Sequence, residues 1–395
     1  MAILAPLVAW FYGDSRLTLI TILSASGFLL GGLSVQHEAL LKRQMRFATL
    51  SAIAVASMIV GYIVGIGFAW RGFGFWSLVL SQLALLLTNT TLVWITCHWL
   101  PGLPSRNSGV RSMLNFGGNI TGYATVNYFS KNADTVLLGR FWGAQPLGLY
   151  NKAAQLVGLP TDQINEPLAS VAIPALSRLA DDPERYRKAY FRIMEKVLML
   201  VMPAVALLIV ASDSLIALVL GPQWVDAGPV LVFMSLAGLV QPLIATVGWL
   251  LVTQGRGRDM FRWSLINAPV SVVSILAGLP WGVSGVALSY SLSRIFVTAP
   301  LMYWFVGRTG PIRTKDFYKL MTPFAAGSLV GICACILFRQ LVPVVNPIWQ
   351  LTAYSCVLAA TNFLVLSAIP SGRSALGDIK NSISLLRPTR PAAVI

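Results

Sequence analysis

The chain alternates long apolar segments with short polar ones, and this pattern predicts a bundle of membrane-spanning helices. Within the apolar segments, polar residues do not recur at every second position, as they would in a half-buried strand. Most segments approach the length of about 20 residues that a transmembrane helix requires. Eleven segments have this character: residues 17–36, 48–70, 74–98, 112–141, 146–177, 192–213, 227–252, 263–280, 284–306, 320–338 and 349–369. Residues 1–12 are predicted to be the end of a further membrane helix, so the predicted fold is an all-α polytopic membrane protein rather than a β-barrel.

The polar loops fall into two alternating sets that differ in charge. The basic set contains Lys42, Arg43, Arg46, Arg106, Arg111, Arg178, Arg185, Arg187, Lys188, Arg256, Arg258, Arg262, Arg308, Arg313, Lys315 and Lys319. The other set carries three basic residues in total, Arg16, Arg71 and Arg339. Because positively charged loops stay on the cytoplasmic side of a membrane, the basic loops and the C-terminus are predicted to be cytoplasmic. The segment 181–188 mixes both signs of charge and is predicted to form a short interfacial helix.

Two stretches of the chain repeat each other and divide it into bundles. KRQMRF at 42–47 resembles RGRDMF at 256–261, and GFGFWSLVLS at 72–81 resembles GVSGVALSYS at 282–291. Such a repeat is a common way to build a transporter from two bundles. The predicted domains are a first helix bundle at 1–100, a second six-helix bundle at 101–308, an extra pair of transmembrane helices at 309–370 and a cytoplasmic tail at 371–395.

The two predicted bundles are unequal. The first bundle contains counterparts of the last three helices of the second and the end of a fourth, and it lacks counterparts of 112–141 and 146–177. The repeat therefore predicts that these partners would precede Met1, so that the chain is truncated, either really or through a misassigned start. A naturally asymmetric bundle is the alternative.

The composition is that of a membrane protein and argues against a nucleic-acid partner. Of the 395 residues, 56% are hydrophobic and 11% are charged, and the mean hydropathy is +0.72. A soluble domain carries about 25% charged residues. The formal net charge of +15 would suggest nucleic acid in a soluble protein. Here the basic cytoplasmic loops account for it, so no nucleic-acid binding is predicted.

No metal, no cofactor and no enzymatic activity are predicted. The four cysteines all lie in apolar segments, and the two histidines, His37 and His98, cannot complete a ligand set with them. The motifs HExxH, GxSxG and GK[ST] are absent from the sequence.

Charged residues inside the apolar segments are the candidate functional residues. A charge at the bilayer centre costs from about 2.5 to over 10 kcal/mol, so such residues usually have a role. On 112–141, Lys131 and Asp134 lie on one polar face; on 146–177, Lys152, Asp162 and Glu166 share another. Two polar faces on neighbouring helices predict a shared water-filled cavity. Two further cations are Arg140, near a helix end, and Arg294, in the middle of 284–306 without an acidic neighbour.

These residues also have simpler structural interpretations, which are weakest for Arg294. Arg140 and Lys152 can extend to the membrane surface from helix ends. Lys131 and Asp134 can form a structural ion pair, and Asp162 and Glu166 can bind loops or kinked backbone. The aromatic residues Tyr123, Tyr128, Tyr150 and Tyr290 can stack on sugars or simply pack between helices.

Several motifs resemble one family of exporters. The run SKNADTVLLGRFWGAQPLGLYNKAAQLVGLP at 130–160 follows RSMLNFGGNI and precedes VAIPALSRLADD, LVLGPQW and TQGR. This order is similar to the polysaccharide-transport branch of the multidrug/oligosaccharidyl-lipid/polysaccharide exporter superfamily, and most similar to Wzx-type lipopolysaccharide and exopolysaccharide exporters. The resemblance covers nearly the whole chain and departs at its start, where two helices and most of a third are absent.

The resemblance implies a fold, a substrate and a mechanism. It implies two six-helix bundles plus two extra helices, in the bacterial inner membrane. It implies alternating access, by which a polyprenyl-pyrophosphate-linked oligosaccharide moves from the cytoplasmic to the periplasmic leaflet, and possible protein partners are a polymerase and chain-length or export proteins. Cations would offset the desolvation of the pyrophosphate, so Arg294, Lys131, Arg140 and Lys152 are the substrate-binding candidates. The coupling or supporting candidates are Asp134, Asp162 and Glu166.

Three other functions remain open from the sequence. A drug/cation antiporter of the same superfamily would need an acidic cavity, whereas the polar set here has four basic residues and three acids. A membrane-embedded glycan ligase or polymerase would need large outer loops, which this chain lacks. The third alternative is an inactive truncated fragment.

Overall fold

The computed structural model describes residues 2–100, 125, 128, 129, 132–342, 346–369, 372, 373 and 377. These described residues form helices and turns and contain no strand, which confirms the all-α prediction. The chain divides into two compact units, Met1–Leu114 and Asn115–Ile395.

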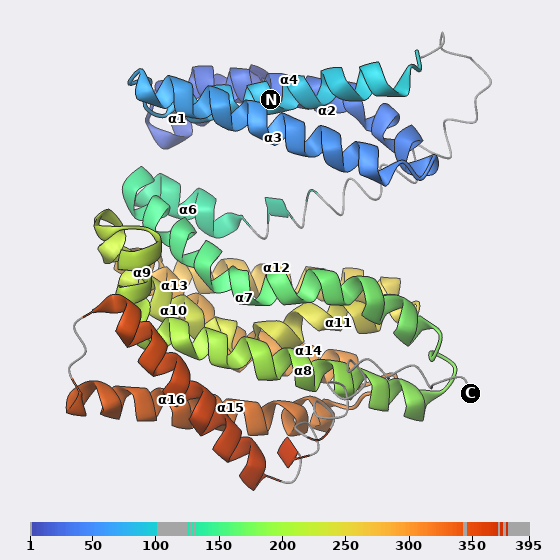
Figure 1. Ribbon diagram of the computed structural model, residues 1–395, viewed down its shortest axis with the longest axis vertical. Coiled ribbons are helices and arrows are strands. Elements are labelled where there is room, and N and C mark those ends of the chain that lie inside the picture. The colour runs from blue at the N-terminus through green and yellow to red at the C-terminus, as the bar shows by residue number, and fades with distance from the viewer. Residues whose placement is uncertain are drawn as a thin grey trace, which may run out of the picture. The chain divides into compact units, whose positions relative to one another are not determined.

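The first unit is a small antiparallel helix bundle. Its elements are η1 (Ala2–Leu4), α1 (Ala5–Tyr12), α2 (Arg16–Arg43), α3 (Phe47–Trp70) and α4 (Trp76–Cys97). The helix α4 packs against both α2 and α3 (Figure 1). The close approach of α3 to α4 depends on small residues, since the Ser81 hydroxyl donates a hydrogen bond to the carbonyl of Gly61 at 2.8 Å. Few side chains are buried here, and Leu41, Ile53 and Val93 form the small core.

The second unit is larger and is organised around one long central helix, α8. Its elements are α6 (Ala133–Phe141), α7 (Ala144–Ser177), α8 (Pro183–Val210), α9 (Ser212–Val219), η2 (Pro222–Ala227), α10 (Gly228–Gly238), α11 (Gln241–Thr253), α12 (Gly257–Gly278), η3 (Leu279–Trp281), α13 (Gly282–Ser293), η4 (Arg294–Thr298), α14 (Ala299–Gly307), α15 (Thr314–Leu341) and α16 (Pro347–Ala368). The helix α8 packs against α7, α10, α15 and α16. Two buried hydroxyl pairs join it to α11, Tyr186 with Thr253 at 2.6 Å and Tyr190 with Thr246 at 3.2 Å.

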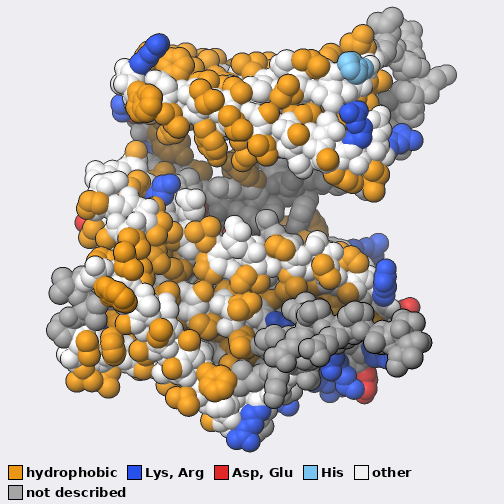
Figure 2. Space-filling view, viewed as in Figure 1, with side chains coloured by type: hydrophobic (Ala, Val, Ile, Leu, Met, Phe, Trp, Pro, Cys, Tyr) orange, Lys and Arg blue, Asp and Glu red, His pale blue; other side chains and the backbone are white. Residues whose placement is uncertain are grey.

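Many of these helices are suited to a membrane. Within the described residues, seven helical stretches are long and apolar enough to span a bilayer, or eight if the bent pair Pro222–Gly238 and Gln241–Thr253 counts as one. One of the seven, Gly257–Gly307, contains the two predicted segments 263–280 and 284–306. Apolar side chains cover much of the visible surface, and basic ones gather toward the ends of the helices (Figure 2). The prediction of a polytopic membrane protein is confirmed.

The structure differs from the predicted segments at three places. The segment 181–188 is not a separate short helix, because Asp182 caps α8 by accepting the Arg185 amide at 3.1 Å and the helix continues to Val210. The predicted segment 227–252 is bent by 42° between α10 and α11. The segment 146–177 is helical as α7 but is not among the membrane-spanning candidates, and 112–141 lies mostly outside the described residues.

The turns of the predicted repeat have similar backbone conformations. In each copy of the repeat, one residue with a positive φ lies before the first helix, and one more lies in each of the two turns that follow. These φ angles are between 57° and 94°. The residues are Gly13, Met45 and Gly72 in the first copy, and Gly221, Gly255 and Gly282 in the second. This left-handed region is open to glycine at low cost and rarely to other residues. The similarity favours the repeat, while the boundaries of the domains remain a prediction.

Candidate functional site

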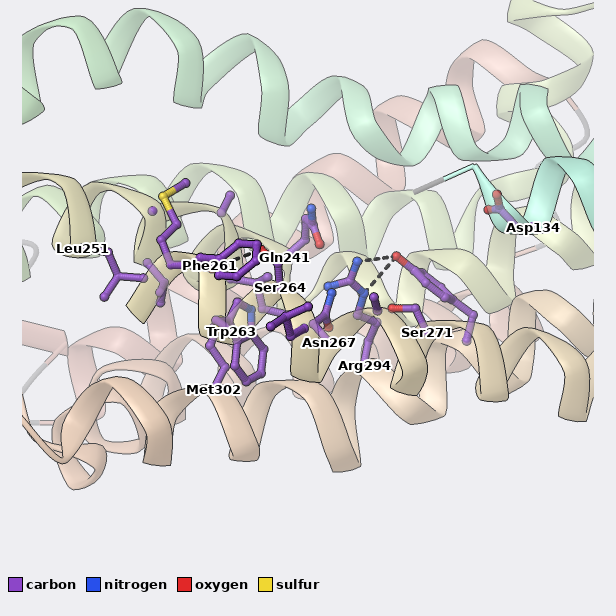
Figure 3. A pocket seen from close by; sticks show the side chains of 18 of the residues that line it. Asp134, Gln241, Leu251, Phe261, Trp263, Ser264, Asn267, Ser271, Arg294 and Met302 are labelled. Carbon is purple, nitrogen blue, oxygen red and sulfur yellow. Dashed lines mark hydrogen bonds between the residues drawn. The ribbon is translucent and has the colours of Figure 1, made fainter. Parts of the chain in front are cut away.

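A cavity of about 480 Å³ opens inside the second unit, next to Arg294 (Figure 3). Three stretches supply most of its wall: α11, α12 and the run from α13 through η4 to α14. Asp134, from α6, lies at one end of the view in Figure 3. Its polar lining residues are Asp134, Gln241, Ser264, Asn267, Ser271, Tyr290 and Arg294. A cavity of this size lies within the range of ligand pockets, about 300–1,000 Å³.

The local backbone explains why Arg294 has room at this place. Arg294 is the first residue of η4, a π-helix in which the amide of Ala299 donates to the carbonyl of Arg294. The next residue is Pro300, which has no amide hydrogen and cannot make the usual bond to the carbonyl four residues earlier. The loss of that bond favours a widened turn. Such π-turns inside α-helices are frequent at functional sites.

The Arg294 guanidinium is held by a tyrosine rather than by an acid. Its Nε and Nη2 atoms donate to the Tyr290 hydroxyl at 2.8 and 2.6 Å, and Cζ lies 5.0 Å from the centroid of the same ring. Among the described residues Arg294 forms no ion pair. Because a guanidinium has five N–H donors, three remain for a ligand in the cavity.

Asp134 is also held by a tyrosine. The Tyr150 hydroxyl donates to its Oδ2 atom at 2.9 Å, and the Thr135 amide donates to Oδ1 at 2.7 Å. Tyr150 comes from α7 and is 1% exposed, so α7 fixes the carboxylate from behind. Asp134 likewise forms no ion pair within the described part of the chain. The cavity therefore contains one cation and one anion that are oriented separately.

The neutral polar wall of the cavity was not predicted from the sequence. Ser264, Asn267 and Ser271 follow one another on α12 at spacings of three and four residues, which places them on one helical face. The Oδ1 atom of Asn267 is buried and has no hydrogen-bond partner in the described structure. The helical spacing of these three residues was a signal that could have identified this wall in advance. A signal for Gln241, at the start of α11 after the bend, is harder to find.

The other predicted residues that the structure describes, Lys152, Arg140 and Asp162, do not line this cavity. The Lys152 ammonium lies 3.5 Å from Gln155 Oε1 and 6.0 Å from the centroid of the Trp224 ring. Arg140, at the end of α6, and Asp162, on α7, are exposed. Lys131 and the side chain of Glu166 lie outside the described residues. Roles for these five residues in the transport path remain predictions.

Of the four predicted aromatic residues, Tyr290 lines the cavity and Tyr150 supports it. Tyr128 is 64% exposed, and Tyr123 lies outside the described residues. Trp263 and Phe261, which the sequence did not single out, add aromatic surface to the wall (Figure 3). Aromatic faces next to polar groups suit the binding of a sugar. The described residues contain no group of three or more His, Cys, Asp or Glu side chains that could hold a metal ion.

Replacing Tyr150 with phenylalanine is expected to destabilise the protein by about 1–2 kcal/mol, because a hydrogen bond to a charged group would be lost. The change would be measured as a lower melting temperature, followed by tryptophan fluorescence in detergent. Tyr128→Phe is the matched control, since that side chain is 64% exposed, and no change is expected for it. Equal melting temperatures for Tyr150→Phe and the unchanged protein would contradict a stabilising role for this bond.

Residues 1–229 of the chain match the family described as "Polysaccharide biosynthesis protein". The chain belongs to this family. Relatives of this polysaccharide biosynthesis chain include the teichuronic acid biosynthesis protein TuaB of Bacillus subtilis (strain 168), at 26% identity over 84% of this chain and 69% of the relative. Lipopolysaccharide biosynthesis protein WzxC of Escherichia coli (strain K12) is 26% identical over 67% of this chain and 54% of its own length. Amylovoran biosynthesis protein AmsL of Erwinia amylovora is 24% identical over 83% of this chain and 86% of its own length.

A solved structure supports the fold of this polysaccharide biosynthesis chain. The lipid II flippase MurJ in its inward closed conformation superposes with a TM-score of 0.69 over 89% of this chain and 74% of MurJ, at 15% identity. At that identity the likeness shows the fold alone. The family match and the relatives above confirm the resemblance to the polysaccharide exporter branch that the motifs predicted. The chain spans about half to two thirds of the length of two of these relatives, 54% of WzxC and 69% of TuaB.

Proposed function

We propose that the chain moves a polyprenyl-pyrophosphate-linked oligosaccharide across the bacterial inner membrane, from the cytoplasmic to the periplasmic leaflet, by alternating access. The observation that carries this proposal is Arg294, a cation inside a membrane-spanning unit that makes no ion pair in the described structure. A charge in such a place is costly unless it has a ligand to bind. The pyrophosphate of a lipid-linked sugar brings about two negative charges to it.

The comparisons support the same substrate class. Two of the relatives are named for the biosynthesis of lipopolysaccharide and teichuronic acid, and the solved structure of similar fold is a lipid II flippase. No covalent step is needed for transport, so the chain acts as a carrier rather than as an enzyme. The C-terminus lies on the cytoplasmic side in this proposal, and a polymerase and chain-length or export proteins take up the product.

The cavity residues have distinct roles in this proposal. The free N–H groups of Arg294 bind the pyrophosphate, because a guanidinium forms paired hydrogen bonds with phosphate oxygens. Asn267, Gln241 and Ser271 bind sugar hydroxyls, and Trp263 offers an aromatic face. Asp134 supports the cycle as a coupling or positioning group. Lys131, Arg140 and Lys152 extend the cationic path, with Asp162 and Glu166 as their counterparts.

Transport can be tested directly in proteoliposomes. The purified chain would be reconstituted with a fluorescent polyprenyl-pyrophosphate oligosaccharide, and a membrane-impermeant quencher would report the rate at which the label changes leaflet. We expect a faster rate than in protein-free vesicles. The control substrate is a polyprenol-linked sugar without the pyrophosphate, which should not be accelerated. Equal rates with and without the protein would contradict the proposed function.

A drug/cation antiporter is the second candidate, and the carboxylate of Asp134 in the cavity wall is the observation that favours it. An antiporter of this kind would move a lipophilic cation and would depend on Asp134 rather than on Arg294. Uptake of ethidium into the same vesicles distinguishes the two. Ethidium transport that Asp134→Asn abolishes, without transport of the lipid-linked sugar, would identify the antiporter.

A further inference from the structure

A second pocket, of about 230 Å³, lies between α8 and α15 in the second unit and shares no lining residue with the Arg294 cavity. The two helices pack side by side, and both begin at the same end of the pocket. Arg187 in the second turn of α8 and Asp316 in the first turn of α15 line it at this end, and Pro323 and Phe324 line it further along α15. Its wall is thus charged at this end and, apart from Glu195, apolar further along the helices.

Arg187 is fixed in place with most of its donors unused. Its Nη2 atom donates to Asp316 Oδ1, and its Cζ atom lies 5.4 Å from the centroid of the Phe191 ring. Asp316 is 7% exposed and also accepts the Arg313 amide at 2.9 Å, so the carboxylate itself is anchored at the start of α15. A guanidinium in one ion pair and against one ring still presents several N–H groups outward.

Lys319 supplies a second cation one turn beyond Asp316 on α15. It lines the pocket, is exposed, and forms no ion pair among the described residues. With Arg187 and Asp316 neutralising each other, Lys319 leaves the mouth of the pocket positive. The remaining acid, Glu195, lies eight residues further along α8 than Arg187, about 12 Å deeper, and already interacts with another residue.

The surroundings of the mouth are also positive. The chain segments 183–196 and 308–319 contain nine Lys or Arg residues and three acids. By the positive-inside rule, this end of the unit faces the cytoplasm. A pocket with cations at its mouth and, apart from Glu195, aromatic and aliphatic side chains below matches the polarity of a membrane lipid, whose charged head lies at the surface and whose chains lie inside.

We propose that this pocket binds the head group of an anionic phospholipid from the leaflet at that end, with the phosphate on Arg187 and Lys319 and the acyl chains along Phe191, Pro323 and Phe324. Basic pockets between transmembrane helices bind such head groups in other membrane proteins. Bound there, the lipid bridges α8 of the bundle to α15 of the extra helix pair. This site is independent of the proposed transport function.

The proposal predicts a lipid-specific rise in thermal stability. The full chain, purified in detergent, would be melted in the presence of phosphatidylglycerol, phosphatidylcholine, polyprenyl phosphate or inorganic phosphate, with tryptophan fluorescence as the signal. A ligand that binds the folded state raises its melting temperature, by an amount that grows with the logarithm of the ligand concentration above Kd. We expect a rise with phosphatidylglycerol that exceeds the rise with phosphatidylcholine, and no rise with inorganic phosphate.

Two variants on one helix make the test specific to this pocket. In Lys319→Ala, the rise in melting temperature that phosphatidylglycerol produces should fall by at least half. Lys315→Ala, one turn earlier on α15 and also exposed but outside the pocket, should keep it. Lys319→Arg should keep it as well. An equal rise for Lys319→Ala and the unchanged protein would overturn the proposal, as would a rise that polyprenyl phosphate or inorganic phosphate produces and phosphatidylglycerol does not.

Discussion

Replacing Arg294 with alanine is expected to slow transport of the lipid-linked oligosaccharide at least about tenfold, because a charge-assisted hydrogen bond contributes about 1.5–3 kcal/mol and 1.4 kcal/mol corresponds to a factor of ten. The loss should be large because no other basic residue lines the cavity within the described part of the chain. The reconstituted transport assay measures this rate directly. The amount of protein in the membrane should not change, because Arg294 bonds to Tyr290 on its own helical run and to no other helix in the described structure.

Two control variants separate the charge of Arg294 from its other properties. Arg294→Lys keeps the charge but loses the planar pair of donors, so partial transport is expected. Arg308→Ala removes a cation just past the end of the same run, where the guanidinium stacks on Trp304 at 4.4 Å and lies outside the cavity. Transport should be nearly unchanged in that variant. The hypothesis of a cationic cavity would be abandoned if Arg294→Ala transported the lipid-linked sugar at the rate of the unchanged protein.

That Arg294 would face a cavity rather than lipid could be predicted from the sequence for a simple physical reason. A lone cation in the middle of an apolar segment is costly in lipid and usually faces a water-filled cavity, so the position of this one residue was enough for the prediction. The widened turn around it could not be foreseen with the same ease. Pro300 signals a disturbed helix, but several local rearrangements can accommodate a missing amide.

The partners of Arg294 in the cavity were harder to predict. Arg140 and Lys152 were selected because they are charged, and neither lines the cavity, which combines Arg294 with the predicted Asp134 and with neutral residues of α12. Neutral amides and hydroxyls cost less in a membrane than charges and attract less notice in a sequence. Asn267 is an example, since its helical spacing from Ser264 and Ser271 marks a polar face as clearly as any charge.

Hydropathy located the apolar part of most helices, but it placed several helix starts too late, and α8 is an instructive example. The start of α8 was placed too late because its first turns are charged, and a scale based on apolarity excludes such residues. The Asp182 side chain, which accepts the Arg185 amide, and Pro183 directly after it form a helix start. A capping residue followed by proline is a local signal that can extend a helix beyond its apolar part.

Replacing Gly285 with alanine is expected to destabilise the protein by about 1–3 kcal/mol, the usual cost of overpacking. An added Cβ atom would lie 2.5 Å from the carbonyl oxygen of Gly278 and 2.5 Å from Cβ of Trp281. One of these two is a backbone atom, so the clash cannot be relieved by turning a flexible side chain. The expected result is a lower melting temperature in detergent.

The same substitution should also reduce transport, because Gly278 and Gly285 lie where α12 and α13 join. Relief of the clash would separate these helices, which carry Asn267 and Tyr290 into the cavity wall. Gly67→Ala is the matched control, since an added Cβ atom at this place in the last turn of α3 meets no atom within 4 Å. That variant should be slightly more stable than the unchanged protein, by about 0.5–1 kcal/mol, because alanine favours a helix over glycine. If Gly285→Ala melted at or above the temperature of Gly67→Ala, the close approach of α12 and α13 would not be required for the fold.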